Sequence, residues 1–182
     1  FFSRVKGQVL RDTDSHGPTK VSGNVQSEKL GQLSAEGILG EQWNKGSKLD
    51  MTFVLDRVSK LSALSSFSFQ GEIPLRAQAT VTTNGEMLLV KELKVKAGRN
   101  DIGGEISYQL NDTNSDRQKI IGKLASNYLN LNDLFPKKEK RYLFGNERIP
   151  LSWAHRADVD LEFAADHLLR RKYKVSDVAL EV

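Results

Sequence analysis

Apolar and polar side chains alternate almost without error in the stretch FSFQGEIPLRAQATV, residues 67–81. A period of two is typical of a β-strand whose faces meet different surroundings. The apolar parity holds Phe67, Phe69, Ile73, Leu75, Ala77, Ala79 and Val81, with Gly71 at the remaining position. Fifteen residues of strand would span roughly 50 Å, far more than a typical strand of five or six residues. Pro74 cannot donate within a sheet, so we expect the strand to bend or divide there.

The same alternation recurs along the chain, in residues 5–9, 21–25, 33–39 and 49–55 among others, whereas helical periodicity is nearly absent. Asn84-Gly85, between two alternating segments, is the strongest short-range signal for a β-hairpin. About nine strands joined by short turns predict a mainly β fold. We expect an antiparallel meander that forms one β-rich domain over residues 1–182.

Glycine often replaces an inward side chain in these segments, at Gly7, Gly23, Gly37, Gly71, Gly104 and Gly122. Glycine within a strand marks a bulge, a bend or a close approach of another group. Apolar residues make up 38% of the chain and aromatic residues 8%, so a second apolar layer would be thin. This favours a curled sheet or open groove, with a closed β-sandwich as the alternative. We expect the seven apolar residues of 67–81 to line the groove and bind acyl chains.

Two later segments break the regular pattern. Residues 132–157 contain two of the four prolines and many apolar side chains, including Trp153, which are too apolar for a solvated loop. We expect this excursion to fold back over the sheet, with a short helical turn near residues 151–155. In the last segment the apolar parity changes after Val175, which predicts a bulge near Ser176-Asp177.

Residues that carry chemistry are sparse. Cysteine is absent, and the three histidines, His16, His155 and His167, lie in separate segments. Only His155 has a second metal-type ligand at motif spacing, Asp158, and a lone pair of this kind is typical of a surface hydrogen bond. No nucleophile elbow, phosphate loop or dinucleotide motif occurs. We therefore expect no enzyme activity, cofactor or metal site.

The net charge of +4 is a mild excess of basic residues that gives little support for nucleic-acid binding. The basic runs 137–141 and 170–174 are typical of solvated loops or of contacts with lipid headgroups.

The second half of the chain carries a family resemblance in DIGGEISYQL, IIGKLASNYLNLNDLFP, YLFGNERIPLSWAHRADVDLEFAADHL and YKVSDVALEV. In order and spacing these stretches resemble the C-terminal region of the AsmA family of Gram-negative envelope proteins, over roughly residues 70–182. The matching positions are Ser126, Leu129, Leu131, Asp133, Leu134 and Pro136, then Pro150, Leu151 and Trp153, then Asp158, Asp160 and Leu161. Asn130 and Asn132 stand where the family often has acidic residues.

The resemblance implies a β-rich periplasmic domain, anchored to the inner membrane by an N-terminal helix outside this sequence. Such a domain would carry phospholipid through an apolar β-groove in outer-membrane biogenesis. The alternative is a structural or adhesive β-sandwich module of an envelope or surface protein. The chain begins at Phe1 and ends within a strand-like segment, so we expect a piece of a longer protein with an edge strand available for pairing with another chain.

Overall fold

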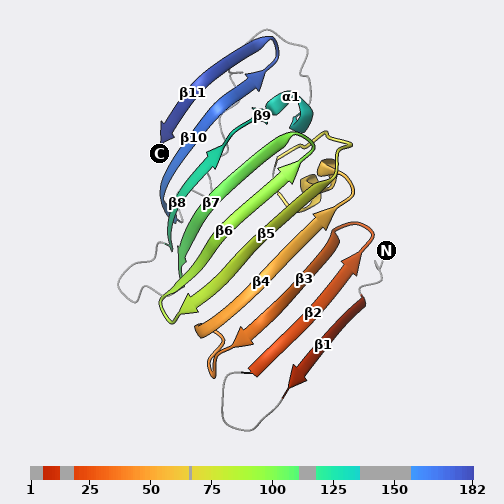
Figure 1. Cartoon of the computed structure of the whole chain (residues 1–182), viewed down its shortest axis with the longest axis vertical. Coiled ribbons are helices and arrows are strands. Elements are labelled where there is room, and N and C mark those ends of the chain that lie inside the picture. The colour runs from red at the N-terminus through yellow and green to blue at the C-terminus, as the bar shows by residue number, and fades with distance from the viewer. Residues whose placement is uncertain (1–5, 13–18, 66, 111–117, 136–156) are drawn as a thin grey trace.

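The computed structural model describes residues 6–12, 19–65, 67–110, 118–135 and 157–182, which form one eleven-stranded sheet and two short helices (Figure 1). The strands are β1 (Lys6–Asp12), β2 (Thr19–Ser27), β3 (Gly31–Leu39), β4 (Lys45–Leu55), β5 (Leu75–Asn84), β6 (Met87–Ala97), β7 (Asn100–Gln109), β8 (Gln118–Ser126), β9 (Leu129–Asn130), β10 (Ala157–Arg170) and β11 (Tyr173–Glu181). The helices are η1 (Val58–Ala63) and α1 (Leu131–Leu134). The predicted mainly β fold is confirmed.

The sheet follows the order β1-β2-β3-β4-β5-β6-β7-β8-β10-β11, and β9 pairs with β10 beside this path. Neighbours are antiparallel from β1 to β8 and again at β10–β11. β10 runs parallel to β8 and β9, so the sheet is mixed at this point, and the predicted antiparallel meander holds from β1 to β8. β1 and β11 lie at opposite edges of a single open layer, and the described residues contain no second sheet to close a sandwich (Figure 1).

Strand register places the apolar side chains in rows that cross the sheet. One row crosses the sheet from β2 to β7, with one residue from each strand opposite a residue of the next strand. Its members are Val25, Leu33, Phe53, Ala77, Val95 and Ile102. A second row runs from β4 to β10 through Leu49, Val81, Val90, Ile106, Gly122 and Leu161. Opposed residues of neighbouring strands point to the same side of a sheet. We call the side that carries these rows the apolar face, and the other side the polar face.

A β-bulge keeps β6 in line with this arrangement. Val90 and Leu93 lie opposite residues of β7 that are only two positions apart, so β6 holds one extra residue between them. Glu92, at this point, has a φ of 52°. The bulge changes the parity of the apolar positions from Leu88 and Val90 to Leu93 and Val95, and both halves of β6 therefore keep their apolar side chains on one face.

The bulge predicted near Ser176-Asp177 is absent, because β10 and β11 keep the same register along their whole length. Asp177 instead adopts a φ of 54° within the strand. Tyr173 and Val175 consequently lie on the polar face, while Val178 lies opposite Ala165 on the apolar face.

The buried core sits at one end of the apolar face, where η1 and the segment after it fold over the ends of β4, β5 and β6. Leu55 and Val58 are 0% exposed and pack with Leu75 and Ala97. The partly buried residues packed against this cluster are Phe53, Leu61, Phe69, Ile73, Ala77, Val95 and Leu134. We call η1, residues 67–74 and residues 131–135 the end cap, and the end of the sheet that it covers the capped end.

The strand predicted for residues 67–81 begins only at Leu75, so the sequence divides directly after Pro74 as expected. Residues 67–74 are not a strand. They run beside η1, where the Val58 amide donates to the Ile73 carbonyl and the Ser59 amide to the Gly71 carbonyl, both at 2.9 Å. An extended segment can alternate in the same way as a strand, which explains why the pattern alone did not distinguish them.

Candidate functional site: the apolar face

The seven predicted groove residues divide between two parts of the molecule. Leu75, Ala77, Ala79 and Val81 lie in β5 and point to the apolar face. Phe67, Phe69 and Ile73 belong to the end cap. Phe69 stacks on Phe135 with ring centroids 5.1 Å apart, whereas Phe67 is 52% exposed. Four of the seven residues therefore lie on one strand, and the other three lie in the end cap.

Sequence reasoning missed how far the face extends. Strand register adds Leu49, Met51 and Phe53 of β4, and Val95 of β6, directly beside the β5 residues. The same period of two in residues 49–55 was the available signal, but only register shows that neighbouring strands present their apolar sides together.

Side-chain size varies across the middle of this face. Ala77 lies between Phe53 on β4 and Val95 on β6, and Ala79 lies opposite Met51. The alanine side chain is only a methyl group, so the surface along β5 is lower than the surface over the larger side chains of β4 and β6. These residues are half-buried rather than buried. Toward the β11 edge the exposure rises, to 56% at Leu180 and 77% at Val182.

The polar face carries charged and hydroxyl side chains. Lys123 on β8 pairs with Glu162 on β10 at 2.8 Å, and this hydrogen-bonded ion pair raises the pKa of Lys123. A shallow hollow of about 380 Å³ lies over β2–β4, lined by Ser22, Gly23, Asn24, Ser34, Ala35, Glu36, Asp50 and Thr52. The Asp50 carboxylate there already accepts a 2.6 Å hydrogen bond from the Thr80 hydroxyl.

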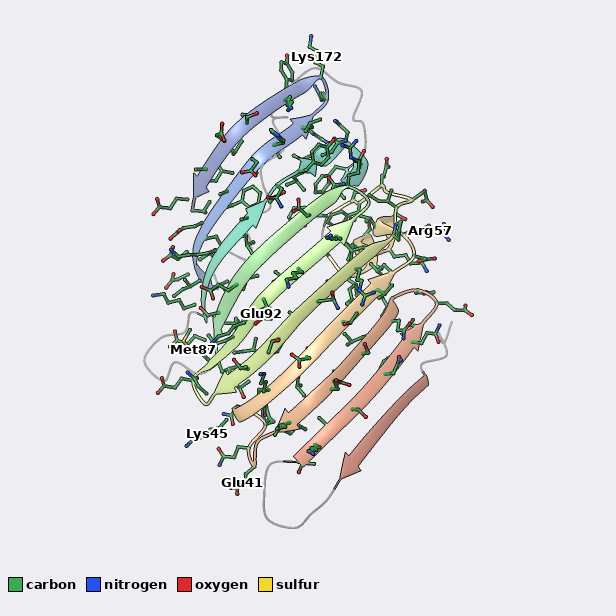
Figure 2. All side chains as sticks on the ribbon, in the orientation of Figure 1. Glu41, Lys45, Arg57, Met87, Glu92 and Lys172 are labelled. Carbon is green, nitrogen blue, oxygen red and sulfur yellow. The ribbon has the colours of Figure 1, made fainter. Side chains whose placement is uncertain are left out.

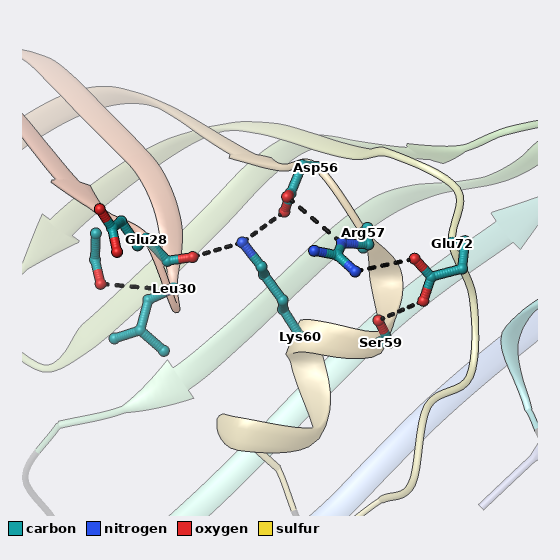
Figure 3. Close-up of polar contacts among 8 residues, drawn as sticks. Glu28, Leu30, Asp56, Arg57, Ser59, Lys60 and Glu72 are labelled. Atoms are coloured by element: carbon teal, nitrogen blue, oxygen red, sulfur yellow. Dashed lines mark hydrogen bonds and ion pairs between the residues drawn. The ribbon is translucent and has the colours of Figure 1, made fainter. Parts of the chain in front are cut away.

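A network of polar contacts ties η1 to the strand ends around it (Figure 3). The Lys60 ammonium donates to the Glu28 carbonyl, in the β2–β3 turn, and pairs with Asp56 at 2.8 Å. The hydrogen bond from Lys60 lowers the pKa of Asp56. Arg57 pairs with Glu72 at 3.2 Å, and the Ser59 hydroxyl donates to the same carboxylate. Lys60 therefore ties the end cap to the β2–β3 turn, and the contacts of Glu72 join η1 to the segment that follows it.

The LNLNDLFP stretch that carries the family resemblance performs a structural task at the capped end. The Asn130 side chain accepts from the Asn132 amide and caps α1. Asn132 in turn accepts a 2.6 Å hydrogen bond from the Arg171 amide, in the β10–β11 turn. Asn100, which is 3% exposed, accepts from the Asn130 amide and donates to the Ala97 carbonyl. These asparagines join β7, α1 and the β10–β11 turn through hydrogen bonds that depend on side-chain amides.

Next to these asparagines, the Asp101 side chain of β7 forms hydrogen bonds with the turn that follows β8. Its carboxylate accepts from the backbone amides of Tyr128 and Asn127, at 2.9 and 3.1 Å, and from the Asn127 side chain at 2.6 Å. Burial raises the pKa of Asp101, but these donors together outweigh burial and the pKa is lowered overall.

The opposite end of the apolar face is framed by the β3–β4 loop, residues 40–44. The Ser47 and Thr83 hydroxyls both donate to the Trp43 carbonyl, at 2.8 and 3.2 Å. The Gly85 amide donates to the Asn44 carbonyl at 2.6 Å. Figure 2 shows Lys45 at this end of the sheet, far from Arg57 at the capped end. We call it the Trp43 end.

The described residues hold no group of three or more histidine, aspartate or glutamate side chains arranged for a metal ion. Among their helices, none has the length and hydropathy required to cross a membrane. Residues 136–156, with Trp153 and most of the predicted excursion, lie outside the described part of the chain, while residues 131–135 contribute to the end cap.

Comparison with known proteins found no matching family model, no matching curated protein and no matching solved structure.

Proposed function

We propose that this chain is a non-enzymatic lipid-handling domain that binds phospholipid acyl chains on its apolar face. The observation that carries the proposal is the register, which aligns apolar residues of β2 to β10 on one side of a single-layer sheet. Water in contact with so large an apolar area is unfavourable, and contiguous patches above a few hundred Å² mark sites of interaction. Acyl chains match this surface because they require no directional hydrogen bonds.

The charged side chains support the same assignment by their position. Exposed charges such as Arg76, Lys94 and Glu162 lie on the polar face, opposite the rows. The middle of the apolar face, around Ala77 and Ala79, carries no charged side chain in the rows described above. A surface divided in this way accepts an apolar ligand on one side while the other side stays hydrated.

The cellular setting follows from the resemblance to the AsmA family alone. We propose a periplasmic domain of an AsmA-like protein, anchored to the inner membrane in the full-length protein and acting in outer-membrane biogenesis. The phospholipid would be cargo, and no cofactor is required for its transfer. Pairing of an edge strand with another chain is a further proposal, for which β1 and β11 are the available edges.

The decisive experiment uses the alternation of β5. A photo-crosslinking residue at Ala79 points to the apolar face, and the same residue at Gln78, its immediate neighbour, points to the polar face. With phospholipid vesicles as the probe, we expect lipid adducts by mass spectrometry from position 79 and none from position 78. Equal labelling at both positions, or no labelling at position 79, would overturn the proposal.

A charge substitution supplies an independent test. Ala79→Asp places a carboxylate where acyl chains would exclude water, a change opposed by several kcal/mol. Without lipid the carboxylate remains hydrated, because Ala79 is only half-buried. We therefore expect an intact cooperative melt and loss of fluorescent phospholipid capture, while the matched Gln78→Asp variant changes neither. A melt that collapses in Ala79→Asp, together with a parent chain that captures no lipid, would favour the sandwich or adhesive module, in which another protein layer covers this face.

A further inference from the structure

We infer that Trp43 is a lipid-binding residue that marks the headgroup end of the bound phospholipid, so that the acyl chains point from the Trp43 end toward the end cap. This inference rests on the proposed function and adds to it an orientation and a contact residue outside the predicted set. It depends on three observations: the side of the sheet on which Trp43 lies, its exposure, and the difference between the two ends of the apolar face.

The loop of Trp43 is bound to the apolar side of the sheet. Thr83 lies opposite Leu88 and two residues after Val81, so its side chain points to the apolar face. The Ser47 amide donates to the Thr83 hydroxyl at 3.3 Å, at the irregularity between Lys45 and Lys48, and Ser47 therefore lies beside Thr83. Both hydroxyls donate to the Trp43 carbonyl. The backbone of Trp43 is therefore held above the apolar face, at its margin.

The Trp43 side chain is 65% exposed although its backbone is fixed. A further hydrogen bond, from the Gly40 amide to the Ser47 hydroxyl at 3.0 Å, completes the loop. Tryptophan has a large apolar ring and one N–H donor, and this combination favours the boundary between hydrocarbon and polar surroundings. At the end of an acyl-chain site, that boundary is the glycerol and ester region of a phospholipid.

The capped end is unsuited to a headgroup. Leu55 and Val58 are fully buried there, and Phe69 stacks on Phe135 over the strand ends. A polar headgroup at this position would displace well-packed apolar side chains. The Trp43 end has half-buried apolar residues such as Leu49 and Val81 and leads to an exposed indole. The ten residues of β5 between these ends span roughly 33 Å, enough for an extended acyl chain.

Fluorescence quenching tests the orientation in a Trp153→Phe background, which leaves Trp43 as the single tryptophan. The probes are two phosphatidylcholines, one brominated near the glycerol end of the acyl chain and one near its methyl terminus. We expect the first to quench Trp43 several-fold more than the second. Equal quenching, or stronger quenching by the second, would overturn the inference.

Affinity and crosslinking provide readouts that do not depend on the background variant. Trp43→Ala is expected to weaken capture of the same lipid about tenfold, because a large apolar contact is lost, whereas Trp43→Phe retains most of it. The control Val54→Ala, at an exposed apolar residue of the polar face, should leave capture unchanged. A photo-crosslinker at position 43 should label the glycerol half of the lipid, and one at position 77 the acyl half.

The outcomes separate the two proposals. A parent chain that captures lipid while Trp43→Ala captures it equally well refutes the role of Trp43 and leaves the proposed function standing. A parent chain that captures no lipid and gives no adduct at position 79 refutes both. Association of the chain with itself that Trp43→Ala abolishes would instead identify Trp43 as a contact between copies and overturn the inference.

Discussion

Val58→Ala should open the end cap without unfolding the sheet. The Val58 side chain is 0% exposed and belongs to a cluster of only four buried residues, with Leu55, Leu75 and Ala97. The substitution removes two methyl groups, each worth about 0.8 kcal/mol when buried, and leaves a small cavity. We expect the free energy of cap opening to fall by about 2 kcal/mol, which raises the open population about 30-fold.

Hydrogen exchange measures this opening directly at the Ser59 amide, which is bonded to the Gly71 carbonyl in the closed cap. Its protection should fall about 30-fold when exchange is limited by the opening equilibrium, while amides of β6 and β7 keep theirs. Val54→Ala is the matched control, because Val54 is 36% exposed on the polar face of the preceding strand. Equal loss of protection in the cap and the central strands would refute a separately opening cap, and unchanged Ser59 protection would refute the packing argument.

Two further predictions concern backbone conformation and pH. Gly104→Ala should destabilise the fold by about 2 kcal/mol or more, since φ is +142° and a Cβ would lie 2.0 Å from the Lys123 carbonyl oxygen. Gly103→Ala should lower the melting temperature much less, because its Cβ would lie 3.3 Å from the Leu93 carbonyl oxygen; equal melting temperatures of the two variants would contradict this reasoning. Asp101→Asn should destabilise the protein at neutral pH, because the hydrogen bonds that lower the native pKa of Asp101 stabilise the folded state above the unfolded pKa of about 3.9. That stabilisation is lost as pH falls through the lower native pKa. Denaturant titrations should therefore show that the difference in free energy of unfolding between Asp101→Asn and the parent shrinks only in acid. A difference that grows in acid would be inconsistent with the contacts of Asp101.

Local chemistry was readable from the sequence where one or two residues determine the backbone. Asn84-Gly85 predicted a hairpin, and β5 and β6 form it, with Gly85 at a φ of +100°. The Asn84 side chain accepts from the Met87 amide at 2.7 Å and stabilises the turn. Pro74 predicted a break, and β5 begins at the next residue. In both places the conformational restriction belongs to the residue itself.

Features that depend on distant partners were not readable in the same way. The parallel pairing of β10 with β8 requires a long connection between the two strands, and the sequence does not state which strand the returning chain will join. Phe69 and Ile73 alternate with the β5 residues, yet they pack against η1 and α1 instead of continuing the strand. Trp43 belongs to the same group, because its exposure and its place on the apolar side depend on hydrogen bonds from residues of β4 and β5.

The apolar rows cross an open sheet from strand to strand. The extent of the apolar face is therefore independent of the contacts around each residue in it. In a closed barrel, the number of strands, their tilt and their stagger are linked, so a change in one alters the register of all. In this open sheet, a strand added at β1 or β11 would extend the face by one interstrand spacing, about 4.8 Å, and leave the neighbours of Ala77 and Ala79 unchanged. Duplication of a hairpin could therefore lengthen the surface in steps of about 10 Å while each existing segment keeps the contacts it already makes.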